Sequence, residues 1–89
     1  MKCEGYIYFL SVKVNGKEYI KIGQTINIKD RINTIQNIVP FLNITLIKKI
    51  YTENRFKVEF DLHKKFKKRN NSHEWYLFGE KDLAYIKSL

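Results

Sequence analysis

The chain has 89 residues, of which 44% are hydrophobic, and its 17 Lys and Arg against 9 Asp and Glu give a formal net charge of +8. A chain of this length forms one domain, residues 1–89, and its Gly and Pro content excludes collagen-like and low-complexity classes. No apolar run approaches the ~18–20 residues of a membrane span. We expect a soluble intracellular protein, in the cytoplasm or at the nucleoid or nucleus, without a membrane partner.

The excess of positive charge favours a polyanionic partner, because a small basic domain attracts a phosphate backbone over a long range. The cations are densest in residues 64–69. We expect these side chains to bind a nucleic-acid backbone: Lys64, Lys65, Lys67, Lys68 and Arg69. A solvated helix end is the alternative interpretation, since cations in a last turn also complement the helix dipole.

The first elements in the chain predict a β-hairpin. Residues 5–14 are rich in aromatic and β-branched side chains, and residues 17–24 form the returning strand. Between them, Asn15-Gly16 is the strongest short signal for a two-residue type I′ turn. This loop length places Tyr8 opposite Gly23 and fixes the register of the two strands.

Directly opposed residues share one face of a hairpin, so the register also predicts two different faces. The core face is expected to carry Ile7, Phe9, Ile20 and Ile22. The other face is aromatic and cationic, is open at Gly23, and is the candidate working surface. It is expected to carry Tyr6, Tyr8, Leu10, Tyr19, Lys21 and Gly23.

The remainder of the chain predicts three helices and two further extended segments. Residues 28–38 follow a possible Asn27 cap and carry an apolar stripe of Ile28, Ile32, Ile35 and Val39. Residues 43–51 predict a third strand, and residues 53–68 a helix with Phe56, Phe60, Leu62 and Phe66 facing inward. A short extended segment at 75–78 and a helix at 80–89 follow. We therefore expect an α+β fold, with a small antiparallel sheet of about three strands, hairpin first, flanked by helices.

Four short motifs occur in order along this framework. They are Gly5-Tyr6-Ile7-Tyr8, then Lys21-Ile22-Gly23 with Gln24-Thr25, then Arg31, and finally Glu59 with Leu62-His63 and Glu74-Trp75. Their order and spacing resemble the GIY-YIG nuclease superfamily, particularly its short phage- and virus-type branch. Lys21 stands where the family's second motif begins with Tyr. The resemblance implies a GIY-YIG-like fold and an endonuclease that hydrolyses phosphodiester bonds.

The same resemblance implies roles for individual residues. Tyr8 would be the base or would position water, Arg31 would stabilise the phosphate, and Glu59 would hold one Mg²⁺ or Mn²⁺ ion. Lys21 departs from the motif, but it lies on the same face as Tyr8, one pair away, and is expected to be a second cation that stabilises the phosphate. The chemistry agrees, because phosphodiester hydrolysis needs a base, cationic stabilisation of developing charge and usually a metal at the leaving oxygen. Glu74 is the alternative metal ligand. An (i, i+4) surface pair with His63 is the structural alternative for Glu59.

His63 is the fourth catalytic candidate, because it could orient the Glu59 carboxylate, bind phosphate or protonate the leaving group. A core or capping histidine is the equal alternative. Besides the basic residues of 64–69, three residues near the hairpin are expected to contact nucleic acid: Tyr19, Gly23 and Gln24.

We therefore expect a GIY-YIG-type, metal-dependent endonuclease acting on DNA, with RNA as an open alternative and without a small-molecule cofactor. The oligomeric state is not defined by the sequence. A non-catalytic nucleic-acid-binding module on the same scaffold is the alternative, favoured by Lys21 in place of Tyr. A third class is a structural or protein-interaction domain whose basic face binds an acidic partner.

Overall fold

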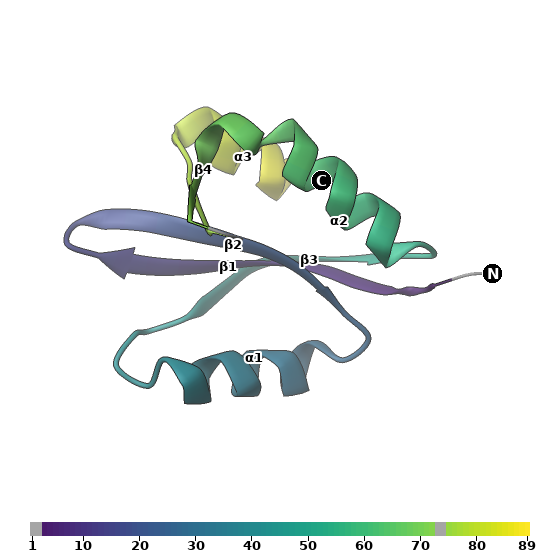
Figure 1. Ribbon diagram of the computed structural model, residues 1–89, viewed down its shortest axis with the longest axis horizontal. Coiled ribbons are helices and arrows are strands. Elements are labelled where there is room, and N and C mark those ends of the chain that lie inside the picture. The colour runs from purple at the N-terminus through teal and green to yellow at the C-terminus, as the bar shows by residue number, and fades with distance from the viewer. Residues whose placement is uncertain (1–2, 73–74) are drawn as a thin grey trace.

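The computed structural model describes residues 3–72 and 75–89, with side chains for 3–69 and 75–89. Within these ranges a five-stranded sheet of order β3-β1-β2-β5-β4 lies between two helical layers (Figure 1). α1 covers one face, and α2 and α3 cover the other. The elements are β1 (Gly5–Val14), β2 (Lys17–Thr25), α1 (Ile28–Ile38), β3 (Thr45–Thr52), α2 (Arg55–Lys65), the 3₁₀ turn η1 (Lys67–Arg69), β4 (Asn70–Ser72), β5 (Trp75–Leu77) and α3 (Glu80–Ser88).

This architecture confirms the α+β class and the helix-flanked antiparallel sheet. The three long strands, β1 to β3, correspond to the expected sheet. Two further strands of three residues each, β5 and then β4, are added beside β2. No helix in the described part of the chain combines the length and apolar character that a membrane crossing requires.

The β1–β2 hairpin has the register expected from its turn. Asn15 and Gly16 both adopt positive φ, 52° and 78°, as a type I′ turn requires. Tyr8 consequently pairs with Gly23. β1 also pairs with β3 along its other edge, which makes it the central strand of the three long ones.

The larger core lies between the sheet and the α2–α3 layer. The expected hairpin residues Ile7, Phe9, Ile20 and Ile22 are each 0% exposed. They pack against Leu62 and Phe66 at the end of α2, and against Tyr76, Phe78 and Ile86. Burying one such side chain contributes about 1.5–3 kcal/mol, so this layer dominates the stability of the domain.

The opposite face holds a second, smaller core, and the expectation of an open working surface is wrong for its central residues. Lys21 and Gly23 are buried, and the Tyr8 ring fills the expected opening at Gly23. The side chains of Tyr8 and Leu10 are 1% and 0% exposed and pack beneath Ile35 of α1. The remaining members of the expected α1 stripe are partly buried around them: Ile28, Ile32 and Val39. The apolar stripe of α1 covers this face because it must itself be removed from water.

The inward face of α2 differs from the expected one. Phe56 and Phe60 are 50% and 65% exposed, whereas Val58 and Leu62 face the sheet. Residues two apart in a helix point about 200° apart, so Phe60 and Leu62 could not both face inward. The helix also ends earlier than expected, at Lys65, where Phe66 forms the C-cap and η1 follows.

Candidate functional site

The Tyr8 ring lies directly across Gly23. The two residues are opposed in the β1–β2 ladder, so their side-chain positions share a face. A Cβ atom added to Gly23 would lie 2.8 Å from Cε2 of Tyr8 and nearer still to Cζ and Oη. Real Cβ contacts do not reach such distances, so the Tyr8 ring occupies the space that a larger residue at position 23 would need.

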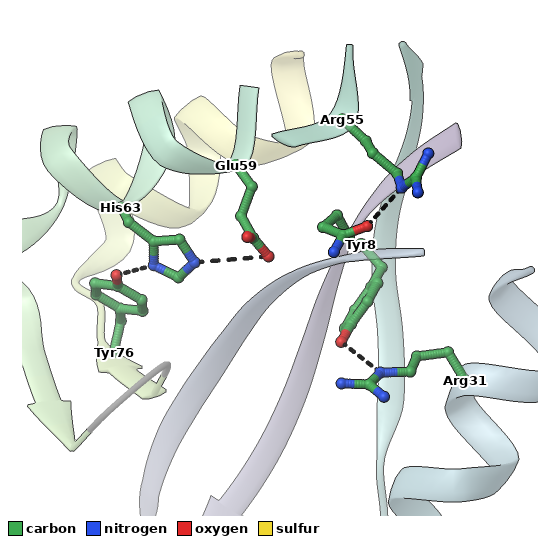
Figure 2. Close-up of polar contacts among 7 residues, drawn as sticks. Tyr8, Arg31, Arg55, Glu59, His63 and Tyr76 are labelled. Atoms are coloured by element: carbon green, nitrogen blue, oxygen red, sulfur yellow. Dashed lines mark hydrogen bonds and ion pairs between the residues drawn. The ribbon is translucent and has the colours of Figure 1, made fainter. Parts of the chain in front are cut away.

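Arg31 meets the hydroxyl end of this ring. Its Nε donates a hydrogen bond of 3.2 Å to the Tyr8 Oη (Figure 2). Arg31 is exposed and lies one turn into α1, whose start is fixed by the Asn27 cap accepting from the Asp30 amide at 3.1 Å. The cap and the hydrogen bond together hold a guanidinium beside the phenol oxygen.

Lys21 and Arg31 line one cleft between α1 and the β2–β5 pair. The cleft has a volume of about 190 Å³ and is lined by Lys21, Arg31, Thr34, Ile35, Ile38, Val39 and Trp75. Lys21 is 9% exposed, and its Nζ lies 5.7 Å from the centroid of the Trp75 ring. The structure therefore gathers Tyr8, Lys21, Gly23 and Arg31 on the α1 side of the sheet.

Glu59 and His63 belong to α2, which covers the other face. Glu59 Oε2 lies 3.9 Å from His63 Nε2, and their side chains are 22% and 25% exposed. Figure 2 shows the Glu59 side chain pointing from α2 toward the sheet, while Tyr8 extends from the sheet toward Arg31. Glu74, the alternative metal ligand, lies outside the described residues.

Tyr76 extends this second group and was not singled out from the sequence. Its hydroxyl hydrogen-bonds Nδ1 of His63, and its side chain is 2% exposed. In β5 it is opposite Ile20, which places it on the α2 face of the sheet. The extended segment predicted at 75–78 implies that its side chains alternate between two faces, but it does not indicate that the segment pairs with β2. The contact of Tyr76 with His63 could therefore not be predicted.

Arg55 is a second polar residue that the sequence did not indicate. At the start of α2 its Nε donates to Gln24 Oε1 at 2.7 Å and its Nη1 donates to the Glu4 carbonyl at 2.8 Å. Its side chain also packs against Gly5, where an added Cβ would lie 2.8 Å from Arg55 Cδ. Arg55 therefore joins α2 to the end of β2 and to the residue before β1. Gln24, which was expected to contact nucleic acid, accepts one of these hydrogen bonds.

The basic residues of 64–69 lie at the end of α2 and in η1, and all five are exposed. Lys65 Nζ lies 4.7 Å from the centroid of the Tyr85 ring, and Arg69 Nε lies 3.0 Å from Asp82 Oδ2. Two of the five cations thus contact α3. Tyr19, the remaining expected contact, is half-buried in β2 opposite Leu77.

Comparison with known proteins gives one family. A family model described as the T5orf172 domain matches residues 5–88. This domain is found in phage and related nuclease-like proteins. No curated protein and no solved structure matches. The matched range contains every element from β1 to α3, and the chain belongs to the T5orf172 domain family.

Proposed function

We propose that this domain is a metal-dependent endonuclease that hydrolyses phosphodiester bonds in DNA by a GIY-YIG-type mechanism. The observation that supports the proposal best is the 3.2 Å hydrogen bond between Arg31 Nε and Tyr8 Oη, formed where Gly23 leaves room for the ring. Three motif residues that are distant in the chain meet at this point. Membership of a family found in nuclease-like proteins agrees with it.

The proposed chemistry assigns a different task to each residue on the α1 side. Tyr8 is 1% exposed while Arg31 is exposed, so a phosphate meets the guanidinium first. Arg31 and Lys21 stabilise the negative charge that develops on the phosphate oxygens, and they require little reorganisation because the fold already holds them at one cleft. Tyr8 positions the attacking water or accepts its proton.

Glu59 is the proposed metal ligand. Magnesium is commonly held by one or two carboxylates, with waters and substrate phosphate completing the shell, and the half-buried Glu59 carboxylate fits such a site. Among residues 3–72 and 75–89, no group of three or more His, Cys, Asp and Glu is gathered for a metal. When bound, the ion would supply positive charge at the leaving oxygen. His63, itself held by Tyr76, would orient the carboxylate.

A second candidate function is a nucleic-acid-binding module without catalysis. One specific observation favours it: Glu59 extends from the helical layer opposite α1, whereas Tyr8 and Arg31 meet on the α1 side. Lys21 in place of the motif's tyrosine favours it as well. Such a module would retain the basic surface and the fold but would not require a metal.

Nicking of supercoiled plasmid by the purified protein separates the two functions. We expect nicking with Mg²⁺ or Mn²⁺, none with EDTA, and loss of nicking in Tyr8→Phe and in Arg31→Ala. Phe60→Ala is the matched control, because Phe60 is 65% exposed on α2 and lies outside both groups of site residues. Plasmid binding without nicking in either metal would favour the non-catalytic module, and equal nicking by all variants would contradict the assigned residues.

A further inference from the structure

Trp75 lines the cleft between α1 and β5 and has no task in the proposed chemistry. Trp75 is opposite Lys21 in the β2–β5 ladder, so its indole lies on the α1 side of the sheet. It is partly exposed and lines the same cleft as Lys21 and Arg31. A partly exposed indole beside two cations is an arrangement that packing of the core does not require.

The size and walls of the cleft limit what it could bind. Its volume of about 190 Å³ is below the range of roughly 300–1,000 Å³ typical of sites for drug-sized ligands. The indole forms one wall, and Ile35, Ile38 and Val39 provide apolar surface. Such a cleft suits one flat ring between an aromatic wall and aliphatic side chains.

The charged part of the cleft suits a phosphate that is linked to that ring through a sugar. Lys21 Nζ lies 5.7 Å from the Trp75 centroid, and Arg31 is exposed at the α1 side. A nucleotide combines a flat base with an adjacent phosphate, so it can contact the indole and the cations together. Base stacking on an aromatic side chain tolerates any sequence, because every base presents a π-face.

We propose that Trp75 stacks an unpaired base next to the phosphate held by Lys21 and Arg31, and that the substrate is single-stranded or locally unpaired DNA. The inference rests on the proposed function, because it assumes that the cleft receives a DNA phosphate. A base in an intact duplex is stacked on its neighbours and must leave the stack to enter a protein cleft. Single strands, bulges and flaps avoid that cost.

Fluorescence of Trp75 tests the inference directly, since it is the single Trp of the chain. The protein is titrated in EDTA with a single-stranded oligonucleotide, a strand of equal length and charge whose central sugars lack bases, a blunt duplex, and the same duplex with a bulged base. Binding is followed separately by the anisotropy of labelled versions. We expect strong quenching by the single strand and the bulged duplex, and little quenching by the abasic strand and the blunt duplex at equal saturation.

Substitution of Trp75 provides a second readout. Trp75→Ala should weaken binding of the base-bearing strand about 5- to 150-fold, the usual effect of removing a stacking aromatic, and should leave abasic-strand affinity unchanged. Trp75→Phe should retain most of the preference for bases, and Phe60→Ala should retain all of it. The fluorescence titration uses the unaltered protein, so it still tests the inference if Trp75→Ala does not fold.

The outcomes distinguish the inference from the function on which it rests. Binding of every DNA with unchanged Trp75 emission, or equal quenching by the abasic strand, would overturn the stacking role and leave the nuclease proposal standing. Failure of all four DNAs to bind would overturn both proposals.

Discussion

Gly23→Ala tests the close approach of Tyr8 to the β2 backbone. The added methyl carbon would lie 2.8 Å from Tyr8 Cε2 and nearer to Cζ and Oη, and the ring is 1% exposed beneath α1. Overpacking of this kind costs about 1–3 kcal/mol. Displacing the ring also removes the hydrogen bond to Arg31, worth about 0.5–1.5 kcal/mol. Alanine otherwise stabilises a strand interior by about 0.5–1 kcal/mol relative to glycine. We therefore expect a net destabilisation of about 1–3 kcal/mol.

A double-mutant cycle with Tyr8→Leu isolates this contact. Leucine lacks the ring atoms that an alanine at position 23 would meet, so in that background Gly23→Ala should be neutral or stabilise the fold. The expected coupling free energy is about 1.5–4 kcal/mol, which covers the upper part of the usual range of about 0.5–3 kcal/mol for residues in contact and extends above it. Urea unfolding followed by Trp75 fluorescence provides the free energies of unfolding.

Gly79→Ser is the matched control for adding a side chain to a glycine. A Cβ at Gly79 meets nothing within 4 Å, and serine is a preferred residue at the N-cap position that Gly79 occupies. It should not lower the free energy of unfolding. Additive effects of Gly23→Ala and Tyr8→Leu would refute the reasoning, because the cost at position 23 would then be independent of the ring.

Three further predictions follow from other contacts. Arg31→Lys should slow DNA cleavage about 10²–10³-fold with little change in DNA affinity, because lysine does not reproduce a planar guanidinium fork; near-normal single-turnover rates would contradict this. Lys64, Lys67 and Lys68 are the three basic residues of 64–69 without a described contact to α3. Replacing them by alanine should reduce the slope of log affinity for duplex DNA against log salt concentration by about 0.9 per lost phosphate contact, and an unchanged slope would contradict their role. The hydrogen bond that Tyr51 donates to Glu4 at 2.5 Å raises the pKa of the Tyr51 hydroxyl, so the stability that this bond contributes is present below pH ~10 and is lost as pH rises through the raised pKa. In a spectrophotometric titration of Glu4→Gln, one tyrosine should ionise at lower pH than in the unaltered protein, and an unchanged titration curve would contradict this.

The hairpin shows what the sequence determines locally. A two-residue turn fixes the pairing of every residue in both strands, so the opposition of Tyr8 and Gly23 could be predicted from Asn15-Gly16. The α1 stripe followed from its helical period in the same way. In each case, one short segment contains all the information that the structure uses.

The arrangement of the layers depends on contacts between distant segments and could not be predicted from local patterns. The apolar stripe of α1 shows that it needs a face to cover, but not that this face holds Tyr8 and Leu10. The Arg55 bonds join α2 to β2 and to the residue before β1, and no spacing in the sequence indicates them. The placement of Glu59 across the sheet from α1 depends on the same packing.

Single-turnover cleavage by the unaltered protein and by Tyr8→Phe tests the central claim most directly. Phenylalanine retains the ring over Gly23 but removes the oxygen that accepts from Arg31. At saturating DNA and Mg²⁺, loss of a general base or its equivalent should reduce the cleavage rate about 10²–10⁴-fold while DNA affinity is unchanged. Equal rates for the two proteins, or no metal-dependent cleavage by the unaltered protein, would contradict a nuclease site at Tyr8 and Arg31.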